Sequence, residues 1–517
     1  MRGEELLAKV WSLATVGMDG HPVTVEVDLN LGLPSFTIVG LPDTAIQEAR
    51  ERVRSAIVNS ECDFPLRRIT VNLAPADLRK EGPSFDLPLA VGILAASGAV
   101  DPCRASDCFY IGELALDGSV RRANGALSMA LAARDAGGKR LIVPAANGSE
   151  AALIKDLEVL PVNHLREVIE HLQGGRELER FRAPEGSLPA AAPAIRAGDF
   201  ADIKGQEQAK RALEVAAAGG HNVLLAGPPG SGKTMLARRM TGILPSLSLP
   251  EAVELTRLYS VAGLLRPGEG LVAERPFRSP HHTVSRAGLI GGGSHPRPGE
   301  ASLAHNGILF LDEMPEFQRS ALEALRQPLE DGRAVIARSL ATVVYPSRFT
   351  LVGAMNPCPC GYWGDRYRDC TCSPPAVDRY RSRLSGPLLD RMDIQIEVPR
   401  LTKEELMREG RERETSETVR RRVQAARELQ LERLQESGRH CNSQMTAREV
   451  ASFCRPTNAA GTFLATAIDR LHLSGRGYEK VLKVARTIAD LEGAASIDTV
   501  HVAEAVQYRS LDRGKGW

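Results

Sequence analysis

The chain has 517 residues, of which 43% are hydrophobic and 25% charged, an ordinary composition for soluble globular proteins of more than one domain. Its 65 Lys and Arg residues nearly balance 64 Asp and Glu residues, so the net charge of +1 excludes a strong general attraction to nucleic acid. Any contact with DNA must therefore come from a local basic patch.

The start of the chain contains acidic residues, and no run in the sequence approaches the about 18 apolar residues of a membrane-spanning helix. The 9 cysteines are an odd number, and several of them cluster, which argues against a disulfide framework and for a reducing compartment. We therefore expect a cytoplasmic protein without a membrane partner.

Residues 1–180 are expected to form an α/β domain. Strand-like runs such as 23–27 and 140–143 alternate with helix-like runs, and the amphipathic pattern of residues 43–60 predicts a helix. The segment 181–198 contains several prolines among small residues, which cannot build a core, and it is predicted to be a linker.

A complete phosphate-loop pattern follows, between the apolar run 222–226 and the helix-like run 235–240. Its glycines let consecutive backbone N–H groups surround a phosphate, and the next helix points its positive end at the same anion. Lys233 is expected to reach the β- and γ-phosphates of ATP, and the Thr234 hydroxyl to bind Mg²⁺. The residues expected to bind the nucleotide are Gly227, Pro228, Pro229, Gly230, Ser231, Gly232, Lys233 and Thr234.

Two further apolar runs end in polar side chains. The run 307–311 leads to Asp312 and Glu313, as expected for a buried parallel strand that delivers acids to the carboxyl edge of a sheet. Asp312 is expected to hold Mg²⁺ and Glu313 to polarise the attacking water. The run 349–355 ends at Asn356, which is expected to orient that water. Paired acids after a phosphate loop indicate ATP hydrolysis as well as binding.

Four cysteines lie in a loop rich in Gly, Pro and polar residues. Four thiolates on one short segment can close a tetrahedral Zn²⁺ shell, and a loop with little apolar content would gain its order from that metal. Because C-x-C spacing is less usual for zinc than C-x-x-C, four free or oxidisable thiols are the alternative. The candidate ligands are Cys358, Cys360, Cys370 and Cys372.

Residues 330–345 have the pattern of two strands around a turn. Arg333 and Arg338 in this hairpin are expected to follow DNA phosphates without reading bases, with an ordinary solvated hairpin as the alternative. His281 and His282 lie in an earlier insert without zinc-like spacing, so they are interpreted as DNA contacts or loop caps and not as metal ligands. The segment 400–517 is mostly helical.

Taken together, these motifs resemble the bacterial Mg-chelatase-like AAA+ family, often called YifB or ComM, over nearly the whole length. The resemblance implies an α/β multidomain fold with a Lon-protease-like α/β domain at 1–180 and a linker at 181–198. A P-loop AAA+ parallel-sheet core with helix-2 and pre-sensor-1 hairpin inserts is implied at 199–399, followed by a helical Mg-chelatase C-terminal lid at 400–517. The segments on which the resemblance rests are 227–234, 279–283, 308–313, 354–361, 386–394 and 476–490.

The same resemblance implies that Arg391 reaches the γ-phosphate of a neighbouring subunit and that Arg486 is a sensor in the lid. It implies a hexameric ring that couples ATP hydrolysis to movement on single-stranded or branched DNA. Branch migration in recombination or natural transformation is the implied activity, with recombination proteins as possible partners. Two alternatives stay open: a metal-insertion motor subunit like that of Mg-chelatase, and a regulatory or chaperone-like ATPase that acts on protein.

In the Lon-like domain, the loop 80–86 resembles the loop that carries the Lon serine and would place Ser84 at the nucleophile position. Leu127 stands where such proteases carry a lysine. A serine without its base stays protonated and weakly nucleophilic. We therefore expect a binding or assembly module and not an active protease.

Overall fold

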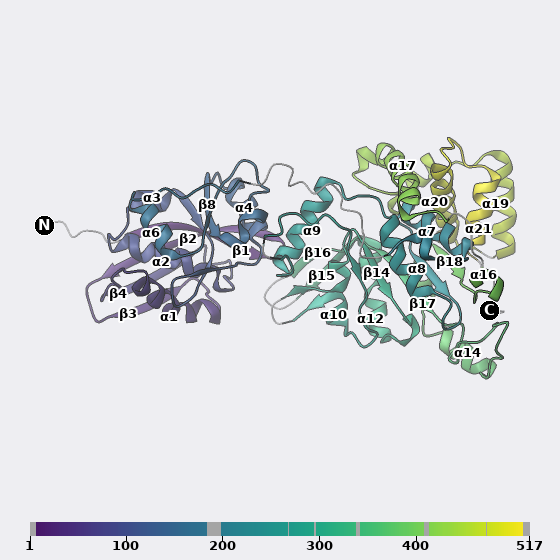
Figure 1. Ribbon diagram of the computed structural model, residues 1–517, viewed down its shortest axis with the longest axis horizontal. Coiled ribbons are helices and arrows are strands. Elements are labelled where there is room, and N and C mark those ends of the chain that lie inside the picture. Colours follow the sequence, from purple (N-terminus) through teal and green to yellow (C-terminus); the bar gives the residue numbers. More distant parts are fainter. Residues whose placement is uncertain are drawn as a thin grey trace. The chain divides into compact units, whose positions relative to one another are not determined.

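The computed structural model describes residues 7–182, 198–266, 268–293, 296–337, 342–407, 413–471 and 473–509 (Figure 1). The chain divides into two compact units. The first unit combines Met1–Pro189 with Leu249–Val272, and the second combines Ala190–Ser248 with Ala273–Trp517. None of the described helices is long and apolar enough to cross a membrane.

The first unit is built on a seven-stranded mixed sheet in the order β3-β4-β2-β1-β5-β8-β9. Its centre is antiparallel, because β2 pairs antiparallel with both β1 and β4, and the other neighbouring strands are parallel. Val23, Val25 and Val27 alternate with polar residues and are fully buried, as a period of two requires of a half-buried strand. The strands are β1 Leu7–Val16, β2 Asp19–Asn30, β3 Ser35–Val39, β4 Arg68–Ala74, β5 Cys108–Tyr110, β8 Arg140–Pro144 and β9 Glu158–Val162, with a separate hairpin of β6 Glu113–Leu114 and β7 Val120–Arg121.

Helices cover this sheet. The predicted amphipathic helix is confirmed as α1, Thr44–Asn59, whose N-cap Asp43 accepts a hydrogen bond from the Ile46 N–H. Helix α2, Asp86–Ala96, is apolar on nearly every side, and all of its residues are buried. The shorter helices are α3 Pro102–Ser106, α4 Ala126–Asp135, α5 Gly148–Ala151 and α6 Leu165–Leu172.

Helix α9, Leu249–Val261, also belongs to this unit, although the sequence pattern places it within the predicted 199–399 ATPase core. It packs against α4, and its Ser260 hydroxyl donates to the buried Glu150 carboxylate at 2.5 Å. The Arg257 guanidinium donates to the Met18 carbonyl at 2.8 Å. The sequence pattern did not predict this packing, because the apolar face of a helix does not say which neighbour will cover it.

The second unit contains a five-stranded sheet in the order β11-β14-β17-β10-β18, and all neighbouring strands in it are parallel. This confirms the predicted parallel sheet. Strands β10 and β14 are buried along their whole length, which explains their continuous apolar sequences. The strands are β10 Val223–Ala226, β11 Phe277–Arg278, β14 Ile308–Leu311, β17 Thr350–Met355 and β18 Ile394–Glu397.

Two inserts depart from the sheet. The first contains α10 Arg286–Ile290 and the paired strands β12 Gly291–Gly292 and β13 Arg297–Pro298. The second is the predicted hairpin, confirmed as the antiparallel pair of β15 Arg333–Ala337 and β16 Thr342–Pro346. Other helices around this sheet are α7 Glu207–Gly219, α8 Lys233–Arg239, α11 Glu300–Leu303, α12 Arg319–Ala324, α13 Arg326–Asp331, α14 Pro374–Arg381 and α15 Gly386–Leu389.

The C-terminal part of the unit is helical, as predicted, and its helices group near α7 (Figure 1). Helices α17 and α20 both pack on α7, and their buried side chains share one apolar cluster with the strands β10 and β18. The helical region and the sheet therefore share one hydrophobic core. Its helices are α16 Lys403–Met407, α17 Ser416–Leu434, α18 Ala447–Phe453, α19 Asn458–Leu471, α20 Gly475–Leu491 and α21 Thr499–Gln507.

Candidate nucleotide and metal sites

The phosphate loop lies between β10 and α8, at the carboxyl edge of the parallel sheet. Gly232 has a φ of +93° and forms the N-cap of α8, a left-handed conformation that glycine adopts without strain. A Cβ at Gly227 would lie 2.1 Å from the Val398 carbonyl oxygen, so this position admits no side chain. The backbone therefore requires these two glycines for its path into α8.

Lys233 is buried inside the loop. Its ammonium donates hydrogen bonds to the Gly227 carbonyl at 2.6 Å, the Pro228 carbonyl at 3.0 Å and the Asn356 side-chain oxygen at 3.3 Å. Burial lowers the pKa of Lys233 to about 8, against the opposing effect of the nearby Asp312 and Glu313 carboxylates. Phosphate oxygens entering the loop would compete with the two carbonyls for this ammonium.

The Thr234 hydroxyl donates to the Asp312 carboxylate at 2.7 Å. The two residues come from α8 and from the end of β14, so the parallel strands bring them together as the sequence predicts. A hydroxyl and a carboxylate are the hard oxygen donors that suit Mg²⁺. These residues therefore fit a magnesium ion held between the protein and nucleotide phosphates.

Glu313 follows directly in a left-handed conformation, with φ 51° and ψ 44°, and its side chain is 57% exposed. The His282 Nδ1 lies 3.8 Å from its carboxylate. The His282 ring is packed by the His281 ring, 4.1 Å away between centroids, and by the edge of Phe317. Our sequence interpretation missed this pair; the available signal was the position of the two histidines just after a strand, β11, that pairs with β14.

The two predicted arginines lie elsewhere. Arg391 is buried, and its guanidinium contacts the Glu330 carboxylate of α13 and the Pro387 carbonyl. Within the described ranges no acceptor reaches its Nε atom. Arg391 thus makes its described contacts away from the phosphate loop of its own chain.

Arg486 is enclosed in the helical region. Its guanidinium donates to the Asp490 carboxylate at 3.0 Å and to the carbonyls of Ala494 and Ala495. Arg433 binds the same carboxylate at 2.6 Å. These contacts join α17 to α20 and to the turn after α20. The role of Arg486 as a sensor stays a prediction.

A buried ionic cluster connects the strand end near Arg391 to helix α20. The Asp393 carboxylate pairs with Lys480 at 2.8 Å and lies 3.7 Å from His221. Burial disfavours its charge, but the Lys480 ammonium and the hydrogen-bonding His221 ring outweigh burial and hold the pKa of Asp393 well below its usual range. Burial in turn lowers the pKa of Lys480.

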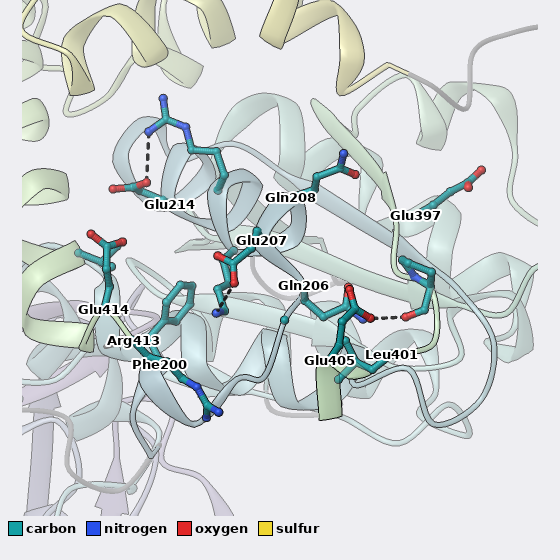
Figure 2. A pocket seen from close by; sticks show the side chains of 15 residues that line it. Phe200, Gln206, Glu207, Gln208, Glu214, Glu397, Leu401, Glu405, Arg413 and Glu414 are labelled. Atoms are coloured by element: carbon teal, nitrogen blue, oxygen red, sulfur yellow. Dashed lines mark hydrogen bonds and ion pairs between the residues drawn. The ribbon is translucent and has the colours of Figure 1, made fainter. Parts of the chain in front are cut away.

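A cavity of about 640 Å³ lies around Gln206 and the start of α7 (Figure 2). Gln206 connects this cavity to the phosphate loop, because its side-chain nitrogen donates to the Pro399 carbonyl at 2.7 Å and to the Ser231 carbonyl of the loop at 3.4 Å. Most of the lining is charged, with an excess of acids. The lining residues that carry charge are Glu207, Lys210, Arg211, Glu214, Glu397, Glu405, Arg413 and Glu414.

The four predicted cysteines converge. The Cys358 and Cys360 sulfurs are 3.4 Å apart and each lies 3.5 to 3.6 Å from the Cys370 sulfur, and all four ligand atoms lie within 4.8 Å of one another. A tetrahedron with Zn–S bonds of about 2.3 Å has edges of about 3.8 Å. Backbone N–H groups donate to the sulfurs of Cys358, Cys370 and Cys372, as expected around thiolate ligands. The cluster therefore fits a Zn²⁺ ion.

Of the two predicted DNA contacts, Arg333 lies exposed at the start of β15, and Arg338 lies outside the described residues. In the pairing of β15 with β16, Arg333 lies opposite Pro346, and the strand pairing ends there. Tyr345 on β16 is buried, and its hydroxyl donates to the Pro296 carbonyl at 2.9 Å, which anchors the hairpin to the first insert.

In the first unit, Ser84 is nearly buried beside Asp86, which pairs with Arg52 at 2.7 Å. Burial raises the pKa of Asp86 to about 6, although Arg52 opposes this shift. Leu127 is fully buried in an apolar cluster. Leu127, which the resemblance to Lon-like proteases leads us to expect at the place of their lysine, is thus part of the hydrophobic core.

Comparison with known proteins gives three family matches. A model described as magnesium chelatase, subunit ChlI, matches residues 199–406, and one described as the ChlI C-terminal part matches residues 413–509. Residues 25–147 match a model described as subunit ChlI of Mg-chelatase.

Relatives match over almost the whole chain. The protein YifB of Salmonella typhimurium is 46% identical over 507 residues, with 98% of each chain covered. The competence protein ComM of Haemophilus influenzae is 45% identical over 509 residues, again with 98% of each chain covered.

Proposed function

The chain belongs to the YifB/ComM family of Mg-chelatase-like AAA+ ATPases, and from this we propose that it is a ring-forming motor that couples ATP hydrolysis to movement on DNA. The family itself implies ATP hydrolysis. The observation that carries the site assignment is the meeting of Lys233, Thr234, Asp312 and Asn356 at one sheet edge.

In the proposed mechanism, Lys233 binds the β- and γ-phosphates and Asn356 orients the attacking water. Thr234 and Asp312 would hold Mg²⁺, which when bound would neutralise charge on the phosphates. Glu313 accepts the proton of the attacking water as general base. The cavity at Gln206 would receive the nucleoside, because its lining touches the phosphate loop through the Ser231 carbonyl.

Arg391 is proposed to complete this site in a neighbouring subunit of a hexamer. A cation supplied by another subunit would stabilise the charge that develops during phosphoryl transfer and make hydrolysis depend on assembly. The pairing with Glu330 supports this, since Glu330 is half-exposed and can be exchanged for a phosphate on the partner. Arg486 keeps its proposed sensor role only if its contacts with Asp490 open on nucleotide binding.

The proposed substrate along which the motor moves is single-stranded or branched DNA. The proposed activity is branch migration in recombination or natural transformation. The support is the exposed Arg333 on the anchored hairpin, together with the similarity to ComM of Haemophilus influenzae, a competence protein. The hairpin arginines would bind phosphates without reading bases. Recombination proteins in the cytoplasm are possible partners in this activity.

The four cysteines are proposed to hold one Zn²⁺ ion, and the first unit to act in binding or assembly. The domain limits expected from the sequence, 1–180, 181–198, 199–399 and 400–517, are kept for this proposal, with α9 reassigned to the first unit. Protease activity is not proposed, because the buried Leu127 leaves Ser84 without a base at the expected place.

A metal-insertion motor is the second candidate, because all three matching family models carry the name of the Mg-chelatase subunit ChlI. The N-terminal domain does not separate the two candidates, since a ChlI model matches residues 25–147 as well. A chaperone-like ATPase acting on protein has no residue in the described structure that favours it over these two.

ATP turnover measured alone, with single-stranded DNA and with a four-way junction tests the proposal. We expect DNA to raise turnover, the wild type to move the junction, and Glu313→Gln to bind ATP but do neither. An ATP turnover rate that no DNA changes, in protein shown to form rings, would favour the metal-insertion motor. Stimulation by a porphyrin and its partner subunits would then identify that activity.

A further inference from the structure

The cysteine loop, residues 358–372, lies directly against the phosphate loop. Between Asn356 and Ser373 the backbone forms no helix or strand, and half of the residues are exposed. Such a segment lacks the regular backbone hydrogen bonds that hold a helix or strand in one conformation. A metal on its four sulfurs would be the strongest constraint on its shape.

Gly361 makes the first contact with the phosphate loop. It has a φ of +88°, and its N–H donates to the Cys358 carbonyl at 3.0 Å, which closes a turn inside the cysteine cluster. A Cβ on Gly361 would lie 2.6 Å from Cδ of Pro229. The turn thus places bare backbone against the Pro229 ring, and only glycine allows this approach.

Arg400 makes the second contact. Its guanidinium pairs with Asp365 at 3.2 Å, lies over the Tyr362 ring at 5.3 Å from the centroid, and donates to the Pro229 carbonyl at 3.4 Å. The Asp365 side chain is 1% exposed, so its charge depends on Arg400 for compensation. One side chain therefore joins the cysteine loop to the backbone of the phosphate loop.

The third connection runs through the chain itself. Asn356, two residues before Cys358, accepts the hydrogen bond from Lys233. The carbonyl of Pro357, between them, accepts from Arg381 at 3.0 Å. The first ligand of the cluster is thus fixed to the strand end that touches the phosphate-binding lysine.

We propose that metal bound by the four cysteines holds the phosphate loop in its nucleotide-binding shape through Gly361 and Arg400, so that metal occupancy sets the affinity for ATP. The inference rests on the proposed zinc and nucleotide sites. It assigns Arg400 as a positioning residue that touches neither metal nor nucleotide. A site that is preorganised by such contacts binds its ligand more tightly, because less ordering is left to the binding step.

The test measures the dissociation constant of a fluorescent ATP analogue on full-length protein with zinc, after removal of zinc by a chelator, and after zinc is restored. We expect removal to weaken binding on the order of tenfold, within the usual range of coupling between sites, and restoration to reverse it. Zinc content is measured in every sample, and far-ultraviolet circular dichroism checks that both units stay folded.

Arg400→Ala separates positioning from metal binding. We expect it to keep about one zinc per chain, to weaken analogue binding by a similar factor, and to make binding insensitive to zinc removal. Arg368→Ala is the matched control, because Arg368 also lies over Tyr362, at 4.2 Å, on the same loop, and its affinity should equal that of the wild type.

Zinc-dependent analogue affinity that is abolished by Arg400→Ala would support the inference. Equal affinity with and without zinc, in protein that binds the analogue through Lys233, would overturn it and leave the proposed ATPase intact. Absence of zinc from protein purified without chelator or oxidant would also overturn it. Analogue binding that is absent even with zinc would instead remove the proposed nucleotide site, and with it the premise of this coupling.

Discussion

The Nδ1 of His282 lies 3.8 Å from the carboxylate of Glu313, the proposed general base. The two residues follow neighbouring parallel strands, β11 and β14, so the sheet itself sets their separation. The His281 and Phe317 rings restrict the orientation of the imidazole. His282 is therefore in place to orient Glu313.

Replacing His282 by Ala should lower kcat roughly tenfold and leave the affinity for ATP unchanged, because orientation of a base affects the chemical step and not phosphate binding. His282→Asn should restore part of the rate by hydrogen bonding. His281→Ala is the control that removes only the stacked ring. An unchanged kcat in His282→Ala would show that Glu313 needs no such partner.

Lys233→Ala should weaken ATP binding by roughly 10- to 100-fold. The substitution removes a hydrogen bond to a charged group, which contributes about 1.5–3 kcal/mol. Equilibrium binding of a fluorescent analogue gives the number. Equal affinity of the variant and the wild type would contradict the assignment of the phosphate loop.

The same lysine predicts a pH dependence. Burial lowers the pKa of free Lys233 to about 8, and bound phosphate favours its charged form and raises that pKa. Affinity for ATP should therefore be constant below about pH 7 and fall as pH rises through 8, by up to tenfold per unit. Lys233→Arg, which stays charged, should lack this fall; a flat wild-type profile to pH 9.5 would refute the prediction.

Arg391→Ala should retain ATP binding but lose turnover by on the order of 10³-fold, the usual effect of an arginine supplied to phosphoryl transfer. Mixing it with Lys233→Ala subunits should recover activity, because each then supplies what the other lacks. Arg383→Ala, which removes a half-exposed partner of Glu316, is the control. Intact mixed rings without recovery would place Arg391 in a role within its own chain.

Asp393→Asn should destabilise the second unit by about 3–5 kcal/mol, because it leaves the buried Lys480 charge uncompensated. Urea midpoints would measure this, and Asp393→Asn combined with Lys480→Met should be more stable than Asp393→Asn alone. Glu417→Gln, at an exposed pair with Arg420, should change stability far less, because water screens exposed ion pairs. A loss no larger than that of the control would mean that the cluster is hydrated.

Arg333→Ala should lower DNA-stimulated ATP turnover and leave the basal rate unchanged, since the proposed contact is with the DNA backbone. DNA binding by the wild type should weaken steeply with salt, with a smaller salt slope in the variant. Arg326→Ala, on α13 just before the hairpin, is the matched control. Equal stimulation in Arg333→Ala would remove this hairpin from the proposed DNA path.

The sequence predicted the features that depend on local pattern and strand direction. The meeting of Thr234 with Asp312, and of Lys233 with Asn356, follows once three apolar runs are taken as parallel strands with polar ends. The convergence of the four cysteines follows from their short spacing.

Contacts between distant side chains could not be predicted in this way. The pairing of Arg391 with Glu330 and that of Arg433 with Asp490 depend on how segments far apart in the sequence pack, which no periodicity encodes. The same holds for α9, whose apolar face fits either unit equally well by pattern alone.

Helix α9 has a practical consequence for work on separate parts of this protein. The first unit is assembled from two separated stretches of chain, so a truncation after residue 189 that keeps only the downstream part would leave Leu255 and Leu258 of α9 facing water. An isolated N-terminal fragment would in turn leave the buried Glu150 without its Ser260 donor. Such pieces should aggregate or unfold for reasons unrelated to ATP or DNA. A faithful dissection would replace 249–272 by a short linker in the ATPase piece and join that helix to the N-terminal piece.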